Sequence, residues 1–105
     1  MELRRVVITG LGAITPIGNT VSEYWDSLCK GVNGAGPVTR FDASKFKTRI
    51  ACEVKNFDPL QYFDRKEARK LDLYTQFALI ASDEAIRDSK ITKDNTDFNE
   101  VGVVF

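Results

Sequence analysis

The sequence predicts an α/β fold with a mostly parallel sheet. A β-branched run at residues 6–9 precedes a glycine-rich loop and an amphipathic helix near residues 21–30, which is the order found in a β-α-β unit. A second apolar run, at residues 100–105, has the continuous hydrophobic character of a parallel strand that is buried on both faces. Together these runs favour strands that alternate with helices.

The composition is that of an ordinary globular chain and argues against several classes of function. The 105 residues are 43% hydrophobic, and fifteen basic residues balance fifteen acidic ones, so net charge favours neither nucleic acid nor an anionic membrane. With two cysteines, no C-x-x-C pair and no histidine, we expect no metal site. Cys29 and Cys52 are predicted to be reduced packing residues in a cytoplasmic protein. Glycine and proline interrupt the N-terminal apolar run, which is too short to span a bilayer.

The predicted first strand and its loop open the chain. Residues 6–9 (Val-Val-Ile-Thr) favour extended backbone, and three glycines and a proline between residues 10 and 18 indicate a tight crossing loop. A dinucleotide-binding loop is the competing interpretation. Thr15 and Pro16 do not fit that fingerprint, and no acidic residue is placed to hold a ribose. The sequence therefore favours a structural loop, and we expect no cofactor.

Capping residues predict where the first helix begins and ends. Thr20 and Glu23 have the spacing of a capping box, so a helix should begin directly after Thr20. Trp25 and Leu28 share its apolar face. Gly31 stands where a left-handed residue would end the helix.

The middle of the chain predicts less regular structure. Residues 31–40 are rich in glycine and indicate an irregular connection, and we expect a brief helical turn at residues 41–46. Residues 48–54 alternate polar with apolar side chains. That pattern predicts an exposed or edge strand.

Three aspartates predict the starts of further helical segments. Asp58 before Pro59 indicates a short turn, and Asp64 begins a helix whose apolar stripe continues to about Ser89. We expect Asp72 to divide this stretch by capping its second part. Small residues in the stripe would permit close packing against a neighbour: Ala78, Ala81 and Ala85.

Four cations gather in the helix that follows Asp64. Arg65, Lys66, Arg69 and Lys70 are spaced so that they lie on one side of that helix. From the residues alone, the simpler interpretation is a solvated face tied to neighbouring carboxylates. The alternative is a surface that steers an acidic partner, whose binding would depend on salt.

Four short motifs follow one another along the chain. They are R-R-V-V-I-T-G-L-G-A-I-T-P-I-G-N-T at residues 4–20, a helix containing Trp25, R-F-D-A-S-K-F at residues 40–46, and R-K-E-A-R-K-L-D at residues 65–72. In this order and spacing they resemble the N-terminus of the elongating β-ketoacyl-acyl carrier protein synthases, type II in particular. The resemblance implies the opening portion of the first half of a five-layer α-β-α-β-α thiolase-type fold. Residues 1–105 would then be an incomplete domain, truncated inside a strand.

The resemblance also implies a function. Relatives catalyse the decarboxylative Claisen condensation of fatty acid biosynthesis, in which a cysteine-bound acyl group reacts with malonyl-acyl carrier protein and two histidines assist. This chain has no histidine, and neither cysteine matches the nucleophile motif, so we expect no catalytic residue within it and no activity from it alone.

Partners follow from the same resemblance. In these synthases the matching basic helix helps to dock the acidic acyl carrier protein, which presents its acyl and malonyl groups on phosphopantetheine. Lys66, Arg69 and Lys70 occupy the corresponding positions. The complete protein is expected to be a homodimer, as relatives usually are. Two alternatives stay open: a non-catalytic chain-length partner subunit, and a module that only binds the carrier.

Overall fold

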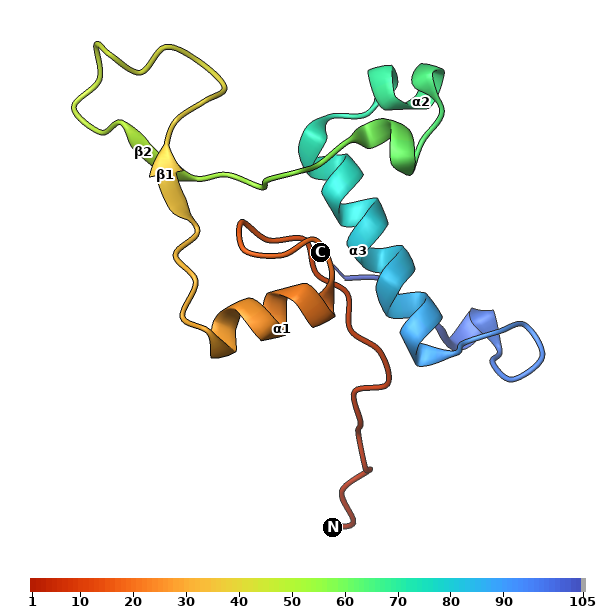
Figure 1. Cartoon of the computed structure of the whole chain (residues 1–105). Coiled ribbons are helices and arrows are strands. Elements are labelled where there is room, and N and C mark those ends of the chain that lie inside the picture. Colours follow the sequence, from red (N-terminus) through yellow and green to blue (C-terminus); the bar gives the residue numbers. More distant parts are fainter. Residues whose placement is uncertain (105) are drawn as a thin grey trace.

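The computed structural model describes residues 1–104. The radius of gyration of 17.7 Å exceeds the roughly 13 Å expected of a compact domain of this length. Ala43 and Ile80 are the only buried hydrophobic residues of the described range, so these elements do not enclose a continuous core. In chain order the elements are α1 (Val21–Cys29), β1 (Ala35–Pro37), β2 (Ile50–Cys52), the 3-10 helix η1 (Pro59–Gln61), α2 (Arg65–Lys70), α3 (Leu73–Ser89) and the 3-10 helix η2 (Phe98–Glu100) (Figure 1).

Helix α3 is the element against which the glycine loop packs. A Cβ atom on Gly10 would overlap the carbonyl oxygen of Ala85, and one on Gly12 would overlap that of Ala81. Only glycine permits the two backbones to approach this closely. The predicted close packing of the small-residue stripe is therefore confirmed at Ala81 and Ala85, and the neighbour is the loop.

Two carboxylates of α3 hold this loop in place. Asp88 Oδ2 accepts a hydrogen bond from the Leu11 amide at 3.0 Å. Glu84 accepts from the Ala13 amide at 2.9 Å through Oε2 and from the Val21 amide at 3.0 Å through Oε1. Because these amides donate to carboxylates, the loop presents negative charge where a phosphate would have to approach. The arrangement supports the structural interpretation of the loop.

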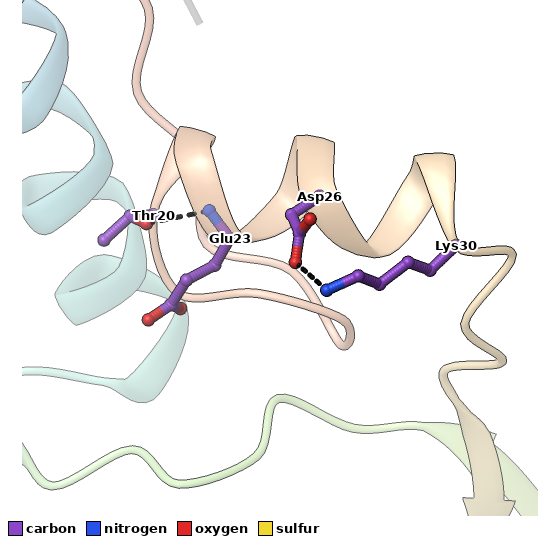
Figure 2. Close-up of polar contacts among 4 residues, drawn as sticks. All are labelled: Thr20, Glu23, Asp26 and Lys30. Carbon is purple, nitrogen blue, oxygen red and sulfur yellow. Dashed lines mark hydrogen bonds and ion pairs between the residues drawn. The ribbon is translucent and has the colours of Figure 1, made fainter.

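The start of α1 follows the capping prediction with one difference. Thr20 Oγ1 accepts from the Glu23 amide at 3.2 Å, as predicted (Figure 2). The Glu23 carboxylate accepts from the amide of Asn19 at 2.8 Å, whereas a standard capping box would return it to the amide of the cap residue itself. The first bond satisfies an amide that the helix leaves unpaired, and the second ties the residue before the cap to the first turn of the helix.

The end of α1 is a left-handed turn at Gly31. Gly31 has φ +66°, as predicted, and the Val32 amide donates to the Ser27 carbonyl at 3.0 Å. This pairing is that of a Schellman motif. Asp26 and Lys30 form an exposed ion pair of 2.6 Å along the same helix (Figure 2).

The sheet differs from the predicted one. β1 and β2 are the only strands among residues 1–104, and they pair antiparallel, with Ala35 opposite Cys52 and Pro37 opposite Ile50. β2 confirms the exposed strand predicted within residues 48–54. β1 lies in the segment predicted to be irregular. Residues 41–46 contain one short turn, closed by the Phe46 amide, which donates to the Ala43 carbonyl at 3.0 Å, and no longer helix. The mostly parallel sheet is therefore a wrong prediction for the described residues.

Neither predicted parallel strand forms. Residues 6–9 and 101–104 have no regular secondary structure, and η2 occupies the start of the second run. Val6 and Ile8 are 89% and 82% exposed. A strand is completed by backbone hydrogen bonds to a neighbouring strand, and β1 and β2 pair only with each other. Phe105, the last residue of the second predicted strand, lies outside the described residues.

Candidate functional site

Helix α2 carries the basic cluster, which consists of Arg65, Lys66, Arg69 and Lys70. All four side chains are exposed on a helix of six residues. The ion pairs found within residues 1–104 lie in α1 and α3, and none involves the basic cluster. The neighbouring acids that the sequence offers as partners therefore do not neutralise it at contact distance. Its positive charge faces solvent.

Asp64 fixes the N-terminal end of α2. Its Oδ1 atom accepts hydrogen bonds from the amides of Lys66 and Glu67, each at 2.8 Å. These two hydrogen bonds make Asp64 the N-cap of α2 and confirm the predicted helix start. A six-residue helix is too short to be stable by itself, so its ends must be held by such contacts.

Gln76 fixes the C-terminal end of α2. Its Nε2 group donates to the carbonyl oxygen of Ala68 at 3.0 Å and to that of Leu71 at 3.1 Å. The side chain is only 4% exposed. Sequence reasoning missed this residue, although a lone amide within the apolar stripe of α3 was the available signal.

Asp72 separates α2 from α3, as predicted, but it acts through its backbone. The Gln76 amide donates to the Asp72 carbonyl at 3.0 Å, whereas the Asp72 side chain makes no capping hydrogen bond. Asp72 is therefore the N-cap residue of α3, as predicted, but its side chain adds no hydrogen bond to the cap. The break follows from the extended backbone of Leu71 and Asp72.

Aromatic contacts join the segment before α2 to α3. The rings of Phe57 and Phe77 meet edge to face with centroids 4.9 Å apart, and those of Phe57 and Tyr62 stack at 5.9 Å. Asp58 caps η1 by accepting from the Leu60 amide at 3.0 Å, as predicted. The segments before and after α2, the helix that carries the basic cluster, are therefore both in contact with α3.

The two cysteines lie outside this arrangement. Cys29 and Cys52 are free and exposed, so their predicted packing role is wrong. Within residues 1–104 no three potential metal ligands gather, and no helix is long and apolar enough to cross a membrane.

The arrangement on α2 suits electrostatic recognition. Lys66, Arg69 and Lys70, the predicted site residues, share this helix with Arg65, and all are available to a partner in solution. Lysine and arginine at physiological pH are donors that fit carboxylates or phosphates. The basic cluster can bind and orient an acidic surface.

The chain is similar to proteins of one family along nearly its whole length. Residues 3–105 match the family model described as "Beta-ketoacyl synthase, N-terminal domain". The chain is 52% identical over 104 residues to the 3-oxoacyl-[acyl-carrier-protein] synthase 2 of Synechocystis sp. and 50% identical over 103 residues to the protein of that name from Coxiella burnetii. These alignments cover 99% and 98% of this chain and 25% of each relative. The chain therefore spans about a quarter of the length of the curated relatives it matches.

A solved structure shares the fold. The ishigamide ketosynthase/chain length factor matches with a TM-score of 0.70 and 38% sequence identity. The match covers 88% of this chain and 23% of that one.

Proposed function

Because the chain belongs to the beta-ketoacyl synthase family, we propose that the complete protein is a 3-oxoacyl-[acyl-carrier-protein] synthase of fatty acid biosynthesis. The observation that carries this proposal is identity of 50% or more, over 98% of the chain or more, to two bacterial proteins of that name. We further propose that residues 1–105 form the opening part of the first half of a five-layer thiolase-type fold, in a cytoplasmic homodimer.

The proposed reaction is a decarboxylative Claisen condensation. An acyl group passes from the phosphopantetheine thioester of one carrier to a cysteine thiol, so that the carrier leaves as a free thiol, which takes up the proton of the cysteine, and the cysteine becomes an acyl thioester. A malonyl group on a second carrier loses carbon dioxide, and the electron pair of the broken carbon–carbon bond attacks the thioester carbonyl. The cysteine leaves as a thiolate, and the carrier keeps the 3-oxoacyl product. Because neither cysteine of this chain matches the nucleophile motif and the chain has no histidine, we assign the nucleophile and its assisting groups to sequence outside it.

The role we propose for this chain is to dock the acyl carrier protein. Lys66, Arg69 and Lys70 would contact the acidic surface of the carrier, and Arg65 would add to the local field. Exposure of the basic cluster and the lack of ion pairs to it within residues 1–104 support this role, because no internal carboxylate has to be displaced. Such binding weakens as salt rises.

A second candidate function is a non-catalytic chain-length partner subunit. The observation that favours it is the similarity to the structure of the ishigamide ketosynthase/chain length factor. Such a subunit would bind the carrier through the same helix while lacking the nucleophile. The basic cluster is compatible with both candidates.

The test is a condensation assay with the purified complete gene product, an acyl-loaded carrier and a malonyl-loaded carrier. We expect release of carbon dioxide and a carrier-bound 3-oxoacyl chain that is longer by two carbons, detected by mass spectrometry. Residues 1–105 alone should give no product. Carrier binding without condensation by the complete protein would support the second candidate, and condensation by residues 1–105 would contradict the proposal.

A further inference from the structure

We propose that Gln76 is a positioning residue that orients the basic cluster for carrier binding. The inference rests on the proposed docking role of α2, and it concerns a side chain that does not itself reach the surface. Gln76 lies in the first turn of α3 and is 4% exposed. Its effect on a partner must therefore pass through α2.

The two carbonyl groups that Gln76 holds flank the C-terminal half of the basic cluster. Nε2 donates to Ala68, which precedes Arg69, and to Leu71, which follows Lys70. The two cations therefore lie between two anchored peptide units. Rotation or fraying of the last turn of α2 would break at least one of these bonds, so the amide limits the directions in which Arg69 and Lys70 project.

The rest of the Gln76 side chain does little for stability. Its Oε1 atom is buried and has no hydrogen-bond partner among residues 1–104. An unpaired buried acceptor opposes folding, and an apolar side chain of similar shape would remove that cost. The favourable contribution of the residue comes from its NH2 group, which acts on α2.

The two ends of α2 are held by different side chains, and among residues 1–104 only Gln76 holds the C-terminal end. Asp64 supplies two hydrogen bonds at the N-terminal end. At the other end, the Leu71 amide donates to the Glu67 carbonyl at 3.2 Å, after which the backbone becomes extended. Gln76 supplies the only side-chain hydrogen bonds to carbonyls of residues 65–71 within the described range. Without them the last turn of a six-residue helix would fray.

The experiment compares Gln76→Met with the wild-type complete protein. Methionine keeps the length and volume of the side chain and removes the donor. We expect faster amide hydrogen exchange in α2 and at Leu71, the residue after it. We also expect affinity for acyl carrier protein that is lower by about tenfold, a coupling typical of residues in one network. Gln61→Met is the matched control, because Gln61 is exposed and its side chain makes no hydrogen bond within the described residues. Gln76→Asn, whose shorter amide cannot reach both carbonyls, is the second variant if the first does not fold.

A double-mutant cycle separates positioning from a general loss of structure. In an Arg69→Glu, Lys70→Glu background, Gln76→Met should cause little further loss of affinity, because its effect acts through those two cations. If the loss of carrier affinity in the combined variant equals the sum of the losses in Gln76→Met and in Arg69→Glu, Lys70→Glu, expressed as free energies, the proposal is overturned. Unchanged hydrogen exchange in α2 of Gln76→Met would also overturn it. If Arg69→Glu, Lys70→Glu alone leaves carrier affinity unchanged, the docking role is wrong. In that case hydrogen exchange still decides whether Gln76 holds α2.

Discussion

Gly12 lies directly against the backbone of α3 at Ala81, where a single added methyl group would overlap the Ala81 carbonyl oxygen. The contact joins the loop that follows residues 6–9 to the longest helix of the described chain. It explains the glycine at this position by packing, with no need for a ligand. It also shows that α3 is the element on which the loop after residues 6–9 rests.

Gly12→Ala should therefore destabilise the complete protein. The loop must move away from α3, which also strains the hydrogen bond from Ala13 to Glu84, so we expect a loss of about 1–3 kcal/mol in the free energy of unfolding. Denaturant titration measures it. Gly36→Ala is the control, because a Cβ at Gly36 would have no atom within 4 Å. Equal stability of the two variants would contradict the packing role.

Glu84→Gln should break the link that the Glu84 carboxylate makes between the loop at Ala13 and the start of α1 at Val21. The carboxylate uses both oxygens to accept from the Ala13 and Val21 amides, and an amide side chain can accept at only one of them. We expect a loss of about 1–3 kcal/mol, measured by denaturant titration. Asp83→Asn removes only an exposed ion pair with Arg87 and should cost less than about 1 kcal/mol. A larger effect at Asp83 than at Glu84 would contradict this account.

Asp64→Ala should destabilise α2 more than Asp72→Ala destabilises α3. Asp64 accepts two amide hydrogen bonds, whereas the Asp72 side chain accepts none in capping. The expected loss is about 0.5–2 kcal/mol for Asp64, with a smaller effect for Asp72. Hydrogen exchange of the Lys66 and Glu67 amides provides a local measurement. Unchanged exchange at those two amides would argue against the cap.

Local chemistry explains which elements the sequence could predict. The starts of α1, η1 and α2 depend on Thr20, Asp58 and Asp64, each of which bonds to an amide two or three residues away. Gly31 ends α1 through its own backbone conformation. Such signals lie within a few residues, so a sequence pattern contains them.

Contacts between distant segments explain the errors. Residues 6–9 and 101–104 have strand-forming side chains, but a strand also needs a neighbour, which a local pattern does not identify. β1 has the unpromising sequence Ala-Gly-Pro and forms because Ile50–Cys52 pairs with it. The role of Gln76 depends on two carbonyls five and eight residues back along the chain, across the break between helices.

The sequence was enough to predict which residues form the candidate site, but not that they are exposed and free of ion pairs within residues 1–104. The spacing of Lys66, Arg69 and Lys70 placed them on one helix, which the structure contains. Their exposure, and the lack of ion pairs to them within residues 1–104, depend on how neighbouring acids are used. The Asp64 carboxylate, for example, accepts from the Lys66 and Glu67 amides and forms no ion pair with the cluster, which cannot be read from the number of charges in the sequence.

The most direct test of the account is the affinity of the complete protein for acyl carrier protein after charge reversal, measured by calorimetry at low and high salt. Lys66→Glu, Arg69→Glu and Lys70→Glu together should lower the affinity by about tenfold or more and weaken its dependence on salt. The control variant reverses Lys45, Lys47 and Lys93, which are exposed elsewhere and change the net charge equally. It should bind nearly as the wild type does. Unchanged affinity of the first variant at low salt would contradict carrier docking by α2.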